Sequence, residues 1–412
     1  MKKVIITVFI IWRLILFFDA YLTSFFLPFR PRFPYSDVLL IPSKLPFWIW
    51  SFANFDGVHY LTIAKNGYSA QFTQVFFPLY PFIIGFISNI FPFLNEIVIG
   101  LSISNISFIL FIYYFIRLLK IDYKSSQIIW ILLFLIFFPT SFYFGSLYTE
   151  SLFMALIISG FYYARINRWW LAGILGALAS ATRPLGIILL PALIWEWQKE
   201  KFKVQSSLPA NATHQALQAG KIKEIDQTTK YKYYISLLHC YIVTLLNSPL
   251  LYLVPLGLIV YMIYLQLTFS DALMFWHVQP IFGAERSGNS VILLPQVFWR
   301  YLKILISVGF QHIGFWIALW ELFFTFFAIY LLLLAHKLKI RTSYLIFSWV
   351  SILIPTITGT LSSMPRYILT AFPLFIVLGV NSGKYMKSVL LIISIILMLI
   401  FTALFTHGYW VA

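Results

Sequence analysis

The sequence predicts an all-α fold, a polytopic membrane bundle of about 11 transmembrane helices. Of the 412 residues, 61% are hydrophobic and 10% are charged, whereas a soluble domain has about 25% charged residues. Long apolar runs repeat along the whole chain. The basic residues lie in short clusters between these runs, which is the orientation signal of a membrane protein. The net charge of +16 therefore does not indicate a nucleic-acid partner.

The first span is expected over Val4–Leu27. Lys2 and Lys3 place its start in the cytoplasm. Residues 28–96 then form a first outer loop with amphipathic, membrane-surface helices. Within it, residues 76–96 are either a short span or an amphipathic hairpin in the outer leaflet. The hairpin is favoured, because most later Lys and Arg clusters then fall on the cytoplasmic side.

The rest of the chain alternates across the membrane and ends outside, as a single transmembrane domain over residues 1–412. The polar loop 198–232 is expected to be flexible and cytoplasmic. A second long outer segment covers 270–312, and its part 290–312 is expected to lie along the surface. The further spans are expected at Ile97–Tyr114, Ile128–Pro139, Ser151–Ala164, Trp169–Thr182, Gly186–Trp197, Pro249–Leu267, Gly314–Leu334, Tyr344–Gly359, Tyr367–Val380 and Leu390–Phe405.

A carboxylate and a histidine stand one helical turn apart in the first outer loop. Asp56 is either the N-cap of a helix that begins near Gly57 or a general base, and a residue can be both. His59 would lie on the same side of that helix, where it could orient the carboxylate or share its proton. Alternatively, His59 is an ordinary interfacial histidine.

Other polar residues converge on the same predicted side of the membrane, which indicates a site. Arg183 and Arg366 are either phosphate ligands or arginines that extend to the interface. Glu150, close to Tyr148, either complements a helix N-terminus or binds substrate hydroxyls. Tyr367 follows Arg366 directly.

The second outer segment adds a mixed polar and aromatic stretch. Asp271, His277 and Gln279 surround it, and such surfaces suit sugar hydroxyls and ring faces. The alternative is an interfacial aromatic belt. The sequence contains no Gly-rich phosphate loop, no His-Glu-x-x-His and no Asp-x-Asp. A metal ion is therefore not expected, and a sugar donor need not be a nucleotide.

Several motifs follow one another in a fixed order. In these motifs the chain resembles the GPI mannosyltransferase II family, the PIG-V type, including its bacterial relatives. That resemblance implies a member of the GT-C glycosyltransferases. The motifs are Asp56-Gly-Val-His59-Tyr60 with Gly67-Tyr68; Phe76-Phe77-Pro78-Leu-Tyr-Pro81; Tyr148-Thr-Glu150-Ser151; Thr182-Arg183-x-x-Gly186; Asp271-Ala-Leu-x-Phe275 with Gln279; and Met364-Pro365-Arg366-Tyr367.

The resemblance implies a membrane helical bundle with its active site at the non-cytoplasmic face, in the plasma or inner membrane if bacterial. A hexose, usually mannose, would move from a polyprenyl-phosphate-linked donor to a lipid or glycan acceptor, with inversion and with no cofactor. Asp56 would be the base. The alternatives are a transporter or flippase of lipid-linked sugars, which would need charges on broken helices near the midplane, and a non-catalytic membrane scaffold.

Overall fold

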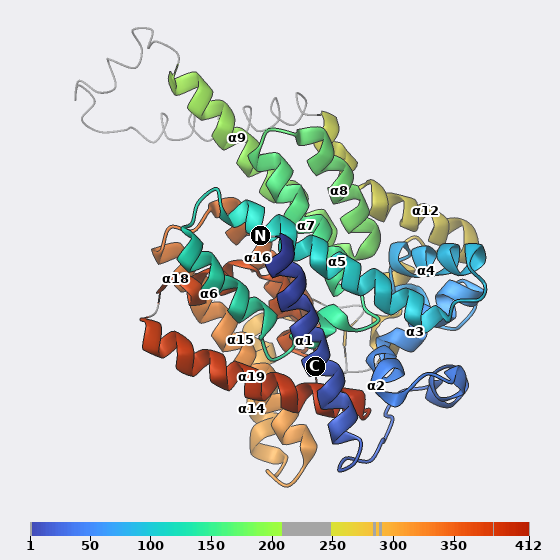
Figure 1. The fold of residues 1–412 in the computed structure, drawn as a ribbon. Coiled ribbons are helices and arrows are strands. Elements are labelled where there is room, and N and C mark those ends of the chain that lie inside the picture. Colours follow the sequence, from blue (N-terminus) through green and yellow to red (C-terminus); the bar gives the residue numbers. More distant parts are fainter. Residues whose placement is uncertain (1, 208–248, 283–285, 288–290, 382, 412) are drawn as a thin grey trace.

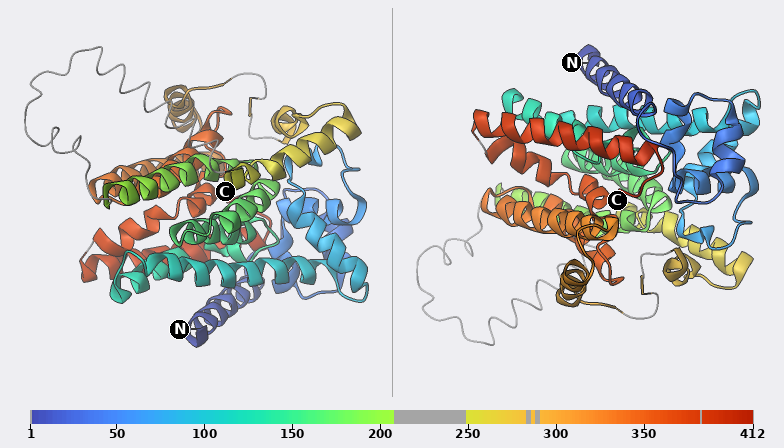
Figure 2. Two further views of the ribbon diagram at one scale, coloured as in Figure 1. Left: turned by 90° about the horizontal axis from the view of Figure 1, so that it is seen from above. Right: turned by 90° about the horizontal axis from the view of Figure 1, so that it is seen from below.

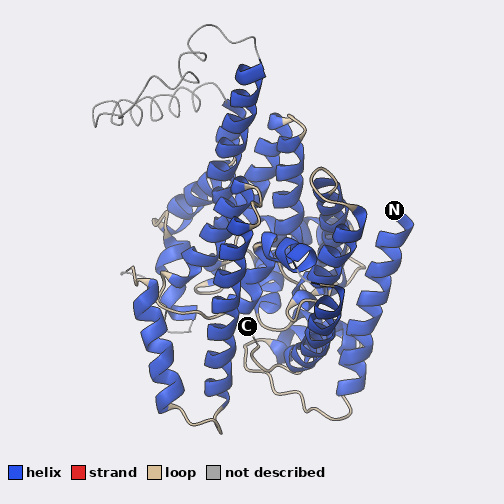
Figure 3. Ribbon diagram, turned by 90° about the vertical axis from the view of Figure 1, so that its left-hand side faces the viewer, coloured by secondary structure: helices blue, strands red, loops and turns tan. Residues whose placement is uncertain are grey.

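The computed structural model describes residues 2–207, 249–282, 286–287, 291–381 and 383–411. All regular structure within these ranges is helical, with no strand (Figure 3). This confirms the predicted all-α class.

Most of the helices lie where apolar runs were expected (Figure 1). Helix α8, for example, spans Trp169–Thr182 as predicted. The α-helices are α1 Lys2–Thr23, α2 Phe47–Trp50, α3 Asp56–Asn66, α4 Leu79–Ile90, α5 Glu96–Leu119, α6 Ser125–Ile136, α7 Glu150–Arg165, α8 Trp169–Thr182, α9 Leu189–Ser207, α12 Leu256–Phe269, α13 Met274–His277, α14 Leu294–Ser307, α15 Ile313–Lys337, α16 Thr342–Thr356, α17 Met364–Tyr367, α18 Pro373–Asn381 and α19 Lys384–Thr406.

Five helical segments in the described ranges are long and apolar enough to cross a membrane, so the protein is membrane-embedded. They are Ile6–Thr23, Glu96–Leu119, Leu250–Phe269, Ile313–Lys337 and Lys384–Thr406. A sixth is reached if the bent pair Met364–Thr370 and Pro373–Asn381 forms one span. The predicted number of about 11 is not confirmed, because some helices at predicted spans are short, such as α6 with 12 residues. That length gives about 18 Å, against a hydrocarbon core of about 30 Å.

Helix α7 forms the centre of the packing, between α5 and α8. Aromatic side chains fill much of this core. The ring of Phe108 on α5 stacks on Phe144 at 4.8 Å between centroids, and both rings are fully buried. Around this centre α1 packs on α19, α6 on α18 and α9 on α16.

Residues 28–96, the predicted first outer loop, and α12 lie at the same end of the molecule, while the far end of α9 projects at the other (Figure 2). The C-terminal residues return to this first segment. The carbonyl of His407 accepts a hydrogen bond from the backbone of Arg30 at 2.9 Å. Helix α4, within the ambiguous stretch 76–96, packs on α3 and α5. Most of the predicted loop 198–232 falls outside the described residues.

The two ends of α7 carry two different ionic clusters. Its first residue is Glu150 and its last is Arg165, and a helix of these 16 residues is about 24 Å long. Arg165 pairs with Asp122 at 2.6 Å, and Arg341 pairs with Glu196. Arg165 and Arg341 therefore lie at the end of α7 away from Glu150.

Candidate active site

The backbone immediately before Asp56 is strained. Phe55 has φ 58° and ψ −115°, a conformation that a non-glycine residue rarely adopts and that is frequent at functional sites. Helix α3 begins at Asp56, with Phe55 as its N-cap and no side-chain capping bond. The interpretation of Asp56 as an N-cap is therefore wrong, and its carboxylate is directed elsewhere.

Tyr148 holds this strained turn in place. Its hydroxyl accepts a hydrogen bond from the backbone N–H of Asp56 at 3.2 Å and donates to the carbonyl of Asn54 at 3.1 Å. The Asn54 side chain donates to the carbonyls of Phe405 and Thr406, each at 2.9 Å. The end of α19 and the segment before α7 thus fix the position of Asp56.

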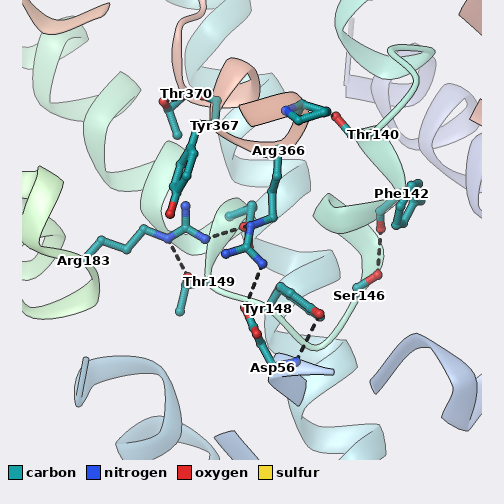
Figure 4. A network of polar contacts seen from close by, with 12 residues as sticks. Asp56, Thr140, Phe142, Ser146, Tyr148, Thr149, Arg183, Arg366, Tyr367 and Thr370 are labelled. Atoms are coloured by element: carbon teal, nitrogen blue, oxygen red, sulfur yellow. Dashed lines mark hydrogen bonds and ion pairs between the residues drawn. The ribbon is translucent and has the colours of Figure 1, made fainter. Parts of the chain in front are cut away.

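Four charged side chains from separate segments form one continuous network (Figure 4). Oδ2 of Asp56 lies 2.7 Å from Nη1 of Arg366. Nε of Arg366 lies 3.2 Å from Oε1 of Glu150, and Glu150 also pairs with Arg183. Nε of Arg183 donates to the hydroxyl of Thr149 at 2.7 Å. We call Asp56, Arg366, Glu150 and Arg183 the charge network.

The charge network contains two acidic and two basic residues, and its members differ in how far they are exposed. Glu150 is 0% exposed, whereas the side chain of Asp56 is 23% exposed. Arg183 and Arg366 are both largely buried. An arginine that extends to the interface would keep its guanidinium in the polar region, so that interpretation is wrong for both. Among the described residues, three buried atoms of the network have no hydrogen-bond partner: Oε2 of Glu150, Nη1 of Arg183 and Nε of Arg366.

Local backbone geometry presents both arginines to the carboxylates. Arg183 is extended between α8 and a 3-10 turn, Pro184–Ile188. A Cβ on Gly186 would collide with the backbone of Ala179 and Ser180, so the Arg-x-x-Gly spacing allows this turn to pack closely. Arg366 lies in the short helix α17, whose N-cap, Ser363, has φ 65°.

His59 lies one turn after Asp56 on α3, as predicted. Its ring stacks on Phe76 at 5.1 Å between centroids, with the Tyr35 ring edge-on at 6.3 Å. Burial lowers the pKa of His59, and the charge of Asp56 opposes this shift. The aromatic contacts of His59 and its lowered pKa fit a neutral imidazole that packs against other rings. A catalytic role for His59 remains a prediction.

Tyr367 lies beside the charge network, and its side chain points toward Arg183 (Figure 4). The guanidinium carbon of Arg366 is 5.9 Å from the Tyr367 ring centroid and 5.5 Å from that of Tyr148. These aromatic faces favour the cationic guanidinium. The predicted group Tyr148, Glu150, Arg183, Arg366 and Tyr367 therefore forms one cluster with Asp56.

The predicted site residues of the segment 270–312 form a separate group. Asp271 and His277 pair with each other at 2.8 Å, with side chains 35% and 50% exposed. Gln279 bonds to the carbonyl of Phe275 and accepts from Arg286 at 3.0 Å. Within the described residues, none of the three predicted side chains contacts the charge network. Their predicted binding of sugar remains untested.

Asn54 and Thr149 were assigned no function from the sequence. Both are fully buried, and both orient members of the cluster. Thr149 lies within the motif Tyr148-Thr-Glu150-Ser151, next to Glu150. The sequence therefore contained a signal that Thr149 belongs to the site. For Asn54 the only signal was an amide two residues before Asp56, between Ala53 and Phe55. In the described ranges no three His, Cys, Asp or Glu side chains lie together as metal ligands would.

Comparison with known proteins gives one finding. The family model described as mannosyltransferase (PIG-V) matches residues 2–219, just over half of the chain. This match includes Asp56, Glu150 and Arg183. No curated protein and no solved structure matches the chain. The family that the motifs indicated is thus confirmed, and the chain belongs to the mannosyltransferase (PIG-V) family of membrane proteins.

Proposed function

We propose that this membrane mannosyltransferase transfers mannose from a polyprenyl-phosphate donor to a hydroxyl of a lipid or glycan acceptor at the non-cytoplasmic face, with inversion. The observation that carries the proposal is the charge network. It joins one partly exposed carboxylate, Asp56, to the buried Arg366 and, through Glu150, to the buried Arg183, as a base and a phosphate site would require. The donor, acceptor and membrane face are parts of the proposal.

Asp56 is the proposed general base. Oδ2 is engaged by Arg366, and among the described residues no other side chain bonds to the carboxylate, so Oδ1 can receive a proton. The acceptor hydroxyl gives its proton to Oδ1, and its oxygen bonds to the anomeric carbon from the face opposite the phosphate. The bond between that carbon and the phosphate oxygen breaks, and the electron pair leaves with the polyprenyl phosphate.

Arg183 is the better candidate for the phosphate ligand. The leaving group changes from a phosphodiester to a monoester and gains negative charge, which a guanidinium stabilises. Within the described part of the chain, Nε of Arg366 also lacks a hydrogen-bond partner, but it lies 3.2 Å from Oε1 of Glu150, and Nη1 of Arg366 pairs with Asp56. Nη1 of Arg183 is the other orphan donor. A buried donor without a partner is costly, so a phosphate oxygen at this point would be favourable. Oε2 of Glu150 is an orphan acceptor, suited to a sugar hydroxyl.

The proposed donor is tested with purified protein in lipid vesicles. Polyprenyl-phosphate-[³H]mannose and a nucleotide-linked [³H]mannose are each offered with a lipid extract as acceptor. We expect label transfer from the lipid-linked donor alone. Arg183→Gln should raise the KM for that donor, while Arg30→Gln, an exposed arginine in the first outer segment, should not. Transfer from the nucleotide sugar alone would refute the proposed donor.

The transporter alternative rests on one residue of the charge network. Charges on broken helices near the midplane were its expected signature, and Arg366 lies in the bent pair Met364–Thr370 and Pro373–Asn381. Asp56 and Glu150, in contrast, are the first residues of α3 and α7. Transport of the intact donor across vesicles, without formation of a mannosylated product, would support the transporter over the transferase.

A further inference from the structure

Helix α14 divides into three faces along its length. Val297 and Tyr301 are buried against the rest of the protein. Leu302 and Ile306 are 43% and 84% exposed. Between these faces, Gln296, Arg300 and Lys303 follow one another at spacings of four and three residues, which places them on one side of the helix. A helix with a protein face, an apolar exposed face and a basic flank is typical of the membrane interface.

The basic flank borders a shallow pocket of about 310 Å³. The pocket is lined by Ile292, Gln296, Val297, Trp299, Arg300, Lys303 and Gly359. Two of these seven residues are cationic and none is acidic. The ammonium group of Lys303 lies 5.6 Å from the centroid of the Trp299 ring, and Trp299 is 59% exposed. The pocket therefore combines positive charge, an amide and apolar walls.

We propose that this pocket binds the phosphodiester headgroup of an anionic glycerophospholipid. Arg300 and Lys303 match the phosphate charge. Trp299, Leu302 and Ile306 stand on the adjoining exposed face, where the acyl chains of a lipid held by its phosphate would lie. Tryptophan is typical of this depth in the membrane. A free inorganic phosphate would satisfy the cations without using the apolar face, so the chemistry favours the lipid.

The pocket is connected to the segment that leads to Arg366. Nη1 of Arg300 donates to the carbonyl of Gly359 at 3.1 Å. Gly359 has φ +89°, and a Cβ there would collide with Ile292. The hydroxyl of Tyr301 accepts from the backbone of Leu361 at 3.0 Å. Helix α14 thus anchors residues 359–361 shortly before α17. A bound phosphate next to Arg300 would stabilise this anchor.

The binding is tested by native mass spectrometry of the full-length protein in detergent, titrated with phosphatidylglycerol or phosphatidylcholine. We expect tighter binding of phosphatidylglycerol. Arg300→Gln with Lys303→Gln should weaken that binding by about 30-fold, since each basic group near an anionic surface contributes about fivefold. Lys303→Gln alone leaves the Gly359 anchor intact and should weaken it by about fivefold. The matched control is Lys120→Gln with Lys124→Gln, two exposed lysines in the turn between α5 and α6.

Equal binding of the two lipids, or equal losses in the α14 variants and in the control, would overturn the site. Inorganic phosphate at millimolar concentration should not displace phosphatidylglycerol, and full displacement would show that the pocket holds a free anion instead. These measurements do not use sugar transfer, so their failure leaves the proposed transferase unaffected.

Discussion

Glu150 is the buried centre of the charge network, and changing it disturbs a balance of two negative and two positive groups. Glu150→Gln leaves the network with one excess positive charge, and Arg183→Gln leaves it with one excess negative charge. The double variant is neutral again, with Asp56 and Arg366 still paired at 2.7 Å. The stability of the three variants therefore should not follow the number of substitutions.

The magnitudes follow from burial. Removing one partner of a buried ion pair costs about 3–5 kcal/mol, because the other charge is left uncompensated. For comparison, unit charges at the 3.2 Å that separate Arg366 Nε from Glu150 interact by about 5 kcal/mol at an effective dielectric constant of about 20. We expect each single variant to lose about 3–5 kcal/mol. The double variant should recover about 2–3 kcal/mol relative to the sum of the two.

The assay is thermal unfolding in detergent, with the variants ranked under identical conditions because membrane proteins often unfold irreversibly. The matched control is Glu96→Gln, since Glu96 is the first residue of α5 as Glu150 is of α7. A carboxylate that only complements a helix N-terminus contributes about 1 kcal/mol or less. If Glu150→Gln behaved like the control, or if the double variant lost the sum of both single losses, the coupled network would be refuted.

Three further predictions concern the support of the site. Tyr148→Phe removes the hydroxyl that fixes the backbone of Asp56, and should lower kcat by about 10- to 100-fold through misplacement; an unchanged kcat in the transfer assay would contradict this. Burial lowers the pKa of His407 below its usual 6.5, against the effect of its bond to a backbone carbonyl. The unfolded chain therefore takes up this proton more readily, and stability should fall as the pH drops through about 6.5. His407→Phe should flatten the dependence of Tm on pH between 8 and 5. An identical slope in this variant and in the wild-type protein would contradict the lowered pKa of His407. Gly186→Ala should displace the turn after Arg183, cost about 1–3 kcal/mol and raise the donor KM. Gly309→Ala, where a Cβ would meet nothing within 4 Å, is its control, and equal Tm values for the two would be the contrary result.

The elements that the sequence predicted well are those with strong local signals. The run of small and apolar residues in α8 is preceded by Arg168 and followed by Arg183-Pro184. The helix has the expected bounds. The number of spans was harder to predict, because several apolar helices are too short to cross by themselves. Whether a short helix crosses depends on its neighbours in the bundle, which hydropathy does not encode.

The grouping of the site was only partly predictable. Topology placed Asp56, Glu150, Arg183 and Arg366 on one side of the membrane, and the structure joins them. The same argument included Asp271 and His277, which form their own pair. Sidedness gives a residue's depth in the membrane but not its position within the plane. The bond from Asn54 to Phe405 links distant parts of the chain, and no local pattern indicates it.

The most direct test of the central claim compares wild-type protein with Asp56→Asn in the transfer of mannose from polyprenyl-phosphate-mannose. The amide keeps the size of the carboxylate but cannot accept the proton. We predict that Asp56→Asn remains folded and loses transfer by about 10²- to 10⁴-fold. Asp37→Asn, an exposed aspartate of the same outer segment, should keep the wild-type rate. Transfer by Asp56→Asn at the wild-type rate would contradict the assignment of Asp56 as the base.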